Sequence, residues 1–282
     1  MSAFYLILVV LGVSGQNITK KMYSQKTGGK GVYLFGMMSV FAAAMFFLLT
    51  SGKMQWDVRV IPYAIGFAVF YAMAVVFGTI AVSCGPLSIT ALISSYSLIL
   101  PTLFGLLFLH EPVRGGLFPG LVLLFVSLVL INRKNENIPI TPKWILCVIL
   151  AFLGNGGCSI AQKLQQSAFA GAYKNEFMFV ALSMVLLVFV TAVLLKERKQ
   201  IAVCAKTVWW LGAACGIMNG VVNLLVMLLS GRLPASFMFP VISAGGVVLT
   251  FFVSTLFYRE KLTKLQILGF VFGAVSVILL NL

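Results

Sequence analysis

The sequence predicts an all-α integral membrane protein with ten transmembrane helices in two inverted five-helix repeats. Three observations predict it: the composition is strongly apolar, the apolar residues fall into ten segments, and the second half of the chain repeats the first. Of the 282 residues, 61% are apolar and 9% are charged. Soluble domains are about half apolar and about one quarter charged. The composition therefore excludes a soluble enzyme, a disordered protein and a secreted disulfide scaffold.

Most of the ten segments have the ~17–25 residues that a helix needs to cross the hydrocarbon core. The first begins almost at Met1, without a basic stretch before it or an Ala-x-Ala cleavage site after it, so we expect it to be a permanent helix and not a signal peptide. Short gaps with charges and turn-forming residues separate the segments. The segments are Ala3–Thr19, Val32–Ser51, Val60–Ser83, Leu87–Leu109, Leu117–Asn132, Trp144–Gln162, Phe177–Leu195, Thr207–Ser230, Ala235–Tyr258 and Leu265–Leu282.

The repeat is visible when the chain is shifted by 149 residues, or by 142 near the start of each half. The copies run through residues 1–135 and 140–282 and hold five spans each. Because five is odd, the second copy must be upside down relative to the first. Inverted repeats of this kind are typical of transporters, in which the two halves exchange conformations. The matches that carry the alignment are His110-Glu111 with Arg259-Glu260, Gly120 with Gly269, Ser127 with Ser276 and Lys21 with Lys163.

A short motif closes the fourth span of each half. It reads Leu109-His110-Glu111-Pro112 followed by Gly120, and Tyr258-Arg259-Glu260-Lys261-Leu262 followed by Gly269; the fourth span also holds Pro101. With two five-helix halves, this pattern resembles the drug/metabolite transporter superfamily, EamA type, over the whole chain. The resemblance implies helices around a central cavity, lined by spans one to four and six to nine. It also implies export or exchange of small metabolites, amino acids, nucleotide sugars or cations. A lipid-linked-sugar flippase or a partner-requiring membrane subunit of the same superfamily is the alternative.

Ionisable groups inside a span are functional candidates, and this chain has few. All six acids lie at or near predicted span ends: Asp57, Glu111, Glu136, Glu176, Glu197 and Glu260. The related four-helix multidrug exporters carry a membrane-embedded Glu in their first helix, and no span here has one. Proton-coupled export of hydrophobic cations is therefore disfavoured. For Glu111 and Glu260 we expect capping of free N–H groups at helix starts.

The spans hold neutral polar side chains instead, several at equivalent places in the two halves. Asn219 and Asn223 are four residues apart and share a helix face. An amide both donates and accepts, which suits an amino acid, a sugar or a polar amine. The alternative is that these groups join helices to each other, at ~0.6–2 kcal/mol each. The candidate substrate-binding residues are Asn17, Tyr71, Ser94, Asn155, Ser159, Asn219 and Asn223.

Lysines and glycines also recur between the halves. Lys20, Lys21 and Lys163 either snorkel to the interface or attract an anionic substrate group. We expect the run Gly154-Asn155-Gly156-Gly157, and Gly245-Gly246 with Pro240, to loosen the sixth and ninth helices. The pairs Gly116/Gly120 and Gly269/Gly273 predict close helix packing in the fifth and tenth spans.

The net charge of +14 lies mainly in the gaps between spans. There it favours binding to anionic lipid and fixes orientation, so we expect a bilayer and a small-molecule substrate as partners and no nucleic acid. A single histidine and the absence of CxxC or Cys/His clusters predict no metal, no cofactor and no catalytic residues, hence no enzyme. The sequence leaves monomer and homodimer open.

Orientation follows from the basic residues of alternate gaps. Fourteen Lys and Arg residues lie on one side and six on the other. The positive-inside rule then places both termini outside the cell membrane. The family resemblance implies both termini inside; we follow the charge count.

Overall fold

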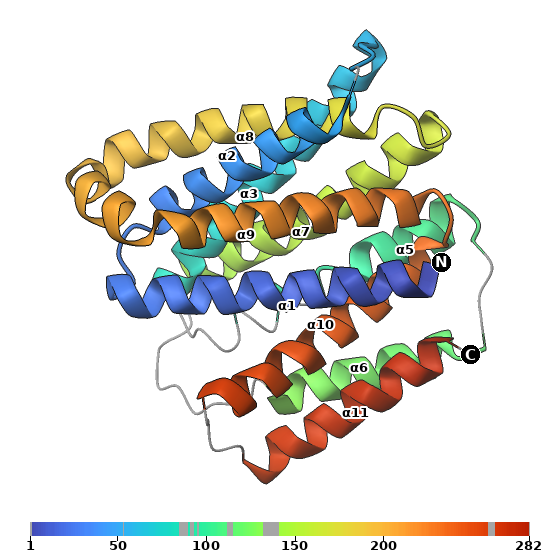
Figure 1. Cartoon of the computed structure of the whole chain (residues 1–282). Coiled ribbons are helices and arrows are strands. Elements are labelled where there is room, and N and C mark those ends of the chain that lie inside the picture. The colour runs from blue at the N-terminus through green and yellow to red at the C-terminus, as the bar shows by residue number, and fades with distance from the viewer. Residues whose placement is uncertain are drawn as a thin grey trace. The chain divides into compact units, whose positions relative to one another are not determined.

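The computed structural model describes residues 2–52, 54–84, 90, 93, 94, 96–111, 115–131, 141–258 and 263–281. Every element within these ranges is a helix (Figure 1). Six of the helices are long and apolar enough to cross a membrane, and the described parts of four other apolar helices are shorter. The predicted fold class, an all-α integral membrane protein, is confirmed. Predictions for Glu136 and Glu260 lie outside the described residues.

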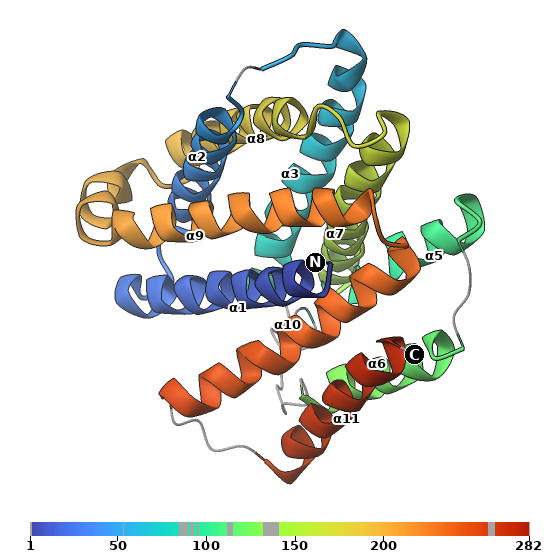
Figure 2. The ribbon, with the colours of Figure 1, turned by 45° about the vertical axis from the view of Figure 1, so that its right-hand side comes forward.

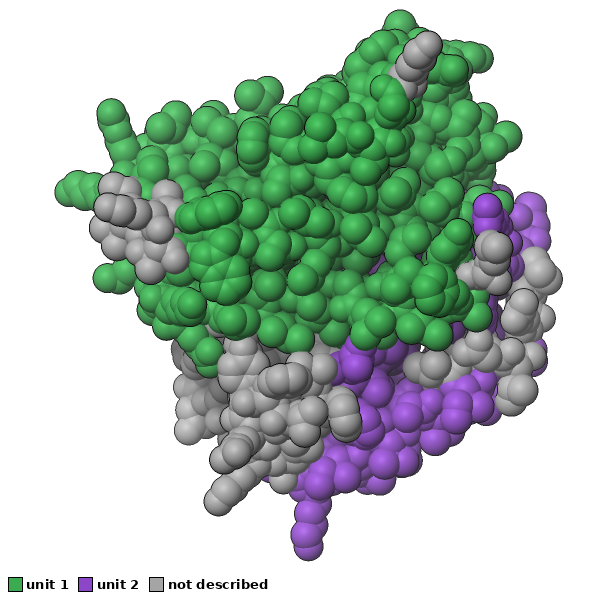
Figure 3. All heavy atoms as spheres, viewed as in Figure 1, with its two compact units in different colours: residues 1–68, 164–231 green, residues 69–163, 232–282 purple. Residues whose placement is uncertain are grey.

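The chain divides into two compact units, coloured separately in Figure 3. Unit 1 comprises residues 1–68 and 164–231, and unit 2 comprises residues 69–163 and 232–282, so each unit draws on both halves of the sequence. Two helices, α3 (Ile61–Cys84) and α7 (Pro142–Ala168), contribute residues to both units. Unit 1 contains α1 (Ser2–Thr27), α2 (Val32–Thr50), η1 (Val58–Val60), α8 (Lys174–Lys196), η2 (Arg198–Gln200) and α9 (Ile201–Ser230). Unit 2 contains α5 (Ile99–Phe108), α6 (Leu117–Ile131), α10 (Ala235–Tyr258) and α11 (Lys264–Asn281).

In unit 1, α9 packs closely against both α1 and α2 (Figures 1 and 2). A stripe of Gly212, Gly216 and Gly220, spaced by four residues, makes this approach to α2 possible. A Cβ added at Gly216 would lie 2.2 Å from the backbone oxygen of Ser39. On α1, a Cβ added at Gly12 would lie 2.4 Å from Cγ2 of Val222. Small residues let membrane helices come together and gain dispersion contacts that lipid chains cannot match.

The two ends of unit 1 are closed by carboxylates that bind backbone N–H groups. Oε2 of Glu197 accepts from the N–H of Leu34 at 2.8 Å, in the first turn of α2. Oε1 of Glu176 accepts from the N–H of Gln55 at 2.9 Å. The first bond joins the connection after α8 to the start of α2, and the second joins the start of α8 to the connection after α2. In unit 1, gaps predicted to lie on the same side of the membrane therefore meet at the same end.

In unit 2, α6 and α11 lie side by side in both ribbon views (Figures 1 and 2). Two hydrogen bonds join them reciprocally. Oγ of Ser127 donates to the carbonyl of Gly269 at 2.7 Å, and Oγ of Ser276 donates to the carbonyl of Gly120 at 2.9 Å. The two serines, like the two glycines, are separated by 149 residues. The close packing predicted for the fifth and tenth spans is confirmed. A two-fold relation between two helices produces such a reciprocal pair of hydrogen bonds.

The glycine runs of the sixth and ninth spans do not loosen their helices, so that prediction is wrong. Helix α7 continues from Pro142 to Ala168, and α10 from Ala235 to Tyr258 with Pro240 inside it. In α7 the glycines serve packing within unit 2. A Cβ added at Gly154 would lie 2.5 Å from the backbone nitrogen of Ala74, and one at Gly157 would lie 2.4 Å from the ring of Phe70.

Candidate functional site

A chain of three amide side chains joins α1 to α9 inside unit 1. Nδ2 of Asn219 donates to Oε1 of Gln16 at 3.2 Å. Nδ2 of Asn223 donates to Oδ1 of Asn219 at 2.9 Å and to its backbone oxygen at 2.8 Å. Gln16 is buried, and both asparagines are half-buried. The shared helix face of Asn219 and Asn223 is confirmed, and the contact with Gln16 shows that the pair also joins two helices.

Asn219, at the centre of this chain, has more hydrogen-bonding capacity than these bonds use. An asparagine side chain offers two N–H donors and an acceptor with two lone pairs. The bonds to Gln16 and from Asn223 take one N–H of Asn219 and one lone pair of its carbonyl oxygen. Half-burial keeps the pair within reach of a second partner. The arrangement can therefore hold two helices together and present a neutral, bifunctional polar group to a solute.

Asn17 is an exposed residue of α1, in unit 1. It follows Gln16 directly and so points about 100° away from it around the helix. The remaining candidates lie in unit 2: Tyr71, Ser94, Asn155 and Ser159.

Tyr71 and Asn155 are half-buried and lie where α3 and α7 make their glycine contacts. On α3, Tyr71 lies between Phe70 and Ala74 in the sequence. On α7, Asn155 lies between Gly154 and Gly157. Ser159, one helical turn beyond Asn155, is buried. The backbone oxygen of Ser94 accepts from both the N–H and the hydroxyl of Ser97.

A buried ion pair closes one end of unit 2. Oε1 of Glu111 lies 3.1 Å from Nζ of Lys163, and each side chain is only 9% exposed. The same carboxylate accepts from the N–H groups of Ala235 and Ser236, at 2.8 and 2.9 Å, at the start of α10. Lys163 also donates to the backbone oxygen of Leu233 at 3.0 Å. The capping role predicted for Glu111 is confirmed, and snorkelling of Lys163 is wrong because its ammonium is buried in this pair.

The pKa of Glu111, which lies in the connection between α5 and α6, follows from these contacts. Desolvation by burial raises the pKa of its carboxyl. The N–H groups of Ser236 and Ala235 and the neighbouring Lys163 lower it further than burial raises it, so the pKa lies below its ordinary value of 4.5. Glu111 is therefore ionised at neutral pH, where its charge stabilises the positive end of the α10 dipole.

Every acid in the described part of the chain is bound to a backbone N–H group. Asp57 completes the set, since it accepts from the N–H of Arg59 at the start of η1. The others are Glu111, Glu176 and Glu197. Among the described residues, no group of three metal-ligating side chains comes together. The described acids are thus all engaged at or near helix ends.

Sequence reasoning missed the part that Gln16 plays. Gln16 was visible as a polar residue of the first span, but only the packing of α1 on α9 shows which partner it meets. The glycine stripe of α9 was also missed. Its four-residue spacing could have identified the face of α9 that packs on another helix, which would have limited the directions open to Asn219 and Asn223.

The fold is that of an integral membrane protein, and comparison with known proteins identifies its family. Residues 142–282 match the profile of the EamA-like transporter family. This match covers half of the chain, and the protein therefore belongs to that family, within the drug/metabolite transporter superfamily, whose members are transporters.

The fold has a solved counterpart. A crystal structure described only as "Crystal structure of protein" aligns over 99% of this chain and 95% of its own, with a TM-score of 0.81 and 14% sequence identity. At that identity the likeness shows the fold alone. No curated protein matches the chain.

Proposed function

We propose that this protein is a secondary transporter that moves a small polar metabolite, or an amino-acid- or amine-like solute, by alternating access of two inverted repeats. The observation that carries the proposal is the amide chain of Gln16, Asn219 and Asn223 in a member of a transporter family. Amide groups bind neutral and zwitterionic solutes through hydrogen bonds without the cost of burying a full charge.

The substrate contacts are the seven residues that the sequence singled out. Asn219 and Asn223 lead the set because they are half-buried, share one face of α9 and join Gln16 in a chain of amides. Asn17, Tyr71, Ser94, Asn155 and Ser159 complete it in this proposal. Polar side chains on several helices offer a solute the hydrogen bonds that specificity needs.

The mode of transport in this proposal is facilitated diffusion, exchange, or coupling through groups other than carboxylates. It is supported by the engagement of all four described acids with backbone N–H groups at or near helix ends. A proton-coupling carboxylate must release and rebind its proton during the cycle. A carboxylate that holds a helix end together would lose its structural bonds each time.

A flux assay tests the proposal directly. The purified protein is reconstituted into liposomes without any partner and offered a panel of labelled amino acids, polar amines and sugars. We expect uptake of at least one soluble solute above that of protein-free liposomes. Movement of a labelled polyprenyl-phosphate sugar alone would favour a flippase, and activity that requires a second protein would favour a membrane subunit; either result would contradict the proposal.

A further inference from the structure

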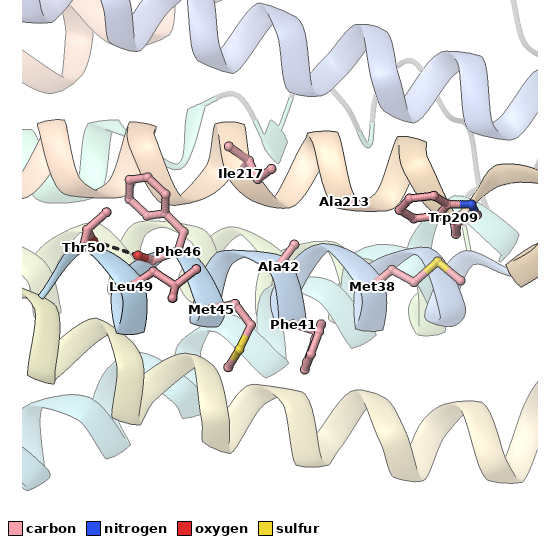
Figure 4. Close-up of a pocket in the computed structure, with 10 residues that line it drawn as sticks. All are labelled: Met38, Phe41, Ala42, Met45, Phe46, Leu49, Thr50, Trp209, Ala213 and Ile217. Atoms are coloured by element: carbon pink, nitrogen blue, oxygen red, sulfur yellow. Dashed lines mark hydrogen bonds between the residues drawn. The ribbon is translucent and has the colours of Figure 1, made fainter.

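An apolar groove of about 600 Å³ runs along α2 and α9 in unit 1 (Figure 4). Its lining includes Met38, Phe41, Phe46, Trp209 and Ile217. The hydroxyl of Thr50, which also lines it, donates to the carbonyl of Phe46 at 2.7 Å. The volume falls within the ~300–1,000 Å³ of small-molecule sites. A polar solute would find few hydrogen-bond partners in this groove. An alkyl chain needs no hydrogen bonds and therefore loses none when it enters.

The rim of the groove is exposed and apolar. Leu49 is 82% exposed, and Phe41 and Ile217 are each 52% exposed. In a chain that crosses a membrane, such side chains meet hydrocarbon and not water. The groove therefore opens to the part of the bilayer that supplies acyl chains.

One end of the groove points to a cationic end of unit 1. Figure 4 shows Thr50 and Leu49 at one end and Met38 and Trp209 at the other. The Trp209 end lies toward the starts of α2 and α9. The ring of Trp210, the next residue on α9, has Nζ of Lys26 5.0 Å from its centroid. A tryptophan with a lysine beside it is typical of the level at which lipid headgroups lie.

The exposed charge of this end has one sign among the described residues. Its acid, Glu197, is buried and bound to the N–H of Leu34. The end therefore presents a positive field to any headgroup at the Trp209 end of the groove. The exposed cations are Lys26, Lys30, Lys196, Arg198 and Lys199.

We propose that this groove binds an anionic phospholipid, with one acyl chain between α2 and α9 and the phosphate beside Lys26 and Trp210. The chain fills the apolar volume, and the phosphate meets the cations at its end. The position of Trp209 in the lining places an indole against the part of the bound acyl chain that is nearest the headgroup. The site is independent of solute transport and is not among the proposed substrate contacts.

Tryptophan fluorescence tests the proposal on the whole protein in detergent. Phosphatidylglycerol and phosphatidylcholine with identical brominated acyl chains are titrated separately, because bromine quenches an indole that it contacts. We expect half-maximal quenching at about fivefold lower phosphatidylglycerol than phosphatidylcholine, since each cation near a headgroup strengthens anionic binding by about that factor. Trp209→Phe should remove most of the selective quenching. Equal quenching by the two lipids would overturn the proposal.

Variants separate the groove from general lipid contact. Ala213→Phe and Ile217→Phe both fill the groove and should weaken phosphatidylglycerol binding at least tenfold, whereas Ala168→Phe, at the exposed end of α7, should leave it unchanged. Lys26→Gln should reduce binding of phosphatidylglycerol but not of phosphatidylcholine, and Arg232→Gln, beyond the opposite end of α9, should reduce neither. Selectivity that survives both groove-filling changes would overturn the proposal. Light scattering provides a second test. If the parent protein is a dimer and the groove-filling changes convert it to a monomer, a second copy occupies the groove and the proposal is overturned.

Discussion

At the scale of single residues, Glu111 shows how far the sequence could be interpreted. A carboxylate between two spans predicted a helix cap, and the structure has one. The capped helix is α10, and its first residue, Ala235, lies 124 residues after Glu111 in the chain. A cap normally serves the helix that follows it locally. Only the tertiary fold brings this acid to a distant helix start, and only the fold brings Lys163 to the acid.

Replacing Glu111 by Gln should destabilise the protein at neutral pH. The change leaves Lys163 buried without its counter-ion, at a cost of about 3 kcal/mol in the free energy of unfolding. The folded-state pKa of Glu111 lies below 4.5, so its stabilising charge is fully present above that pH and is lost as the pH falls through the lowered value. Melting temperatures of the two proteins should differ at pH 7 and converge as the pH falls through the lowered pKa of Glu111. Asp57→Asn, at an exposed pair, serves as the control and should change little. A gap between Glu111→Gln and the parent that stays constant with pH would contradict this assignment.

Replacing Asn219 by Leu should affect both stability and transport. The variant leaves Oε1 of Gln16 without this donor and removes a proposed substrate contact. We expect the apparent affinity for solute to fall ten- to a hundredfold, as loss of ~1–3 kcal/mol implies. Asn223→Leu should act in the same direction, and Asn175→Leu on α8 is the matched control. If both variants melt at lower temperature while the affinity is unchanged, the amides only join the helices.

At the scale of elements, the sequence predicted helices well and their packing partly. Apolar segments of spanning length are an unambiguous signal, and the GxxxG pairs correctly predicted that α6 and α11 pack closely. The glycine runs of α7 and α10 were misinterpreted as loose backbone. Glycine lowers helix propensity by about 1 kcal/mol, but in lipid an unpaired backbone group costs more, so the helices remain intact. Which helix a glycine face meets was not predictable, because that depends on contacts between distant segments.

The α2–α9 contact should fail when its glycine stripe is filled. In Gly216→Ala the new methyl group would lie 2.2 Å from the backbone oxygen of Ser39, which cannot move without the whole of α2. We expect a loss of about 1–3 kcal/mol. Gly66→Ala on α3 is the matched control, because a Cβ there meets nothing within 4 Å, and it should gain up to about 1 kcal/mol from helix propensity. Equal melting temperatures for the two variants would show that the stripe does not determine the packing.

At the scale of the whole molecule, the composition predicted the membrane fold, and the glycine pairs predicted close helix packing at equivalent places in the two halves. The bonds of Ser127 with Gly269 and of Ser276 with Gly120 exchange under the 149-residue shift, which pairs the two serines with each other and the two glycines with each other. The division into two compact units was not predicted. Each unit takes helices from both halves of the sequence, and a repeat boundary does not reveal such an exchange.

Orientation remains a prediction from charge. Fourteen basic residues on one side against six on the other place the termini outside the cell membrane. A phosphatase fused at Leu282, which is active only outside the cytoplasm, should therefore be active. A fluorescent protein fused at the same position, which folds only in the cytoplasm, should stay dark. The opposite pair of results would show that the family orientation outweighs the charge count.

The central claim is that this protein transports a polar solute by alternating access without a membrane-embedded carboxylate. Counterflow tests it most directly: liposomes containing the protein are loaded with unlabelled solute and diluted into labelled solute at equal pH on both sides. We predict a transient overshoot of label above equilibrium that is lost in the Asn219→Leu, Asn223→Leu double variant and retained in Glu176→Gln. Label that never exceeds equilibrium, or an overshoot that requires a pH gradient and disappears in Glu176→Gln, would contradict the account.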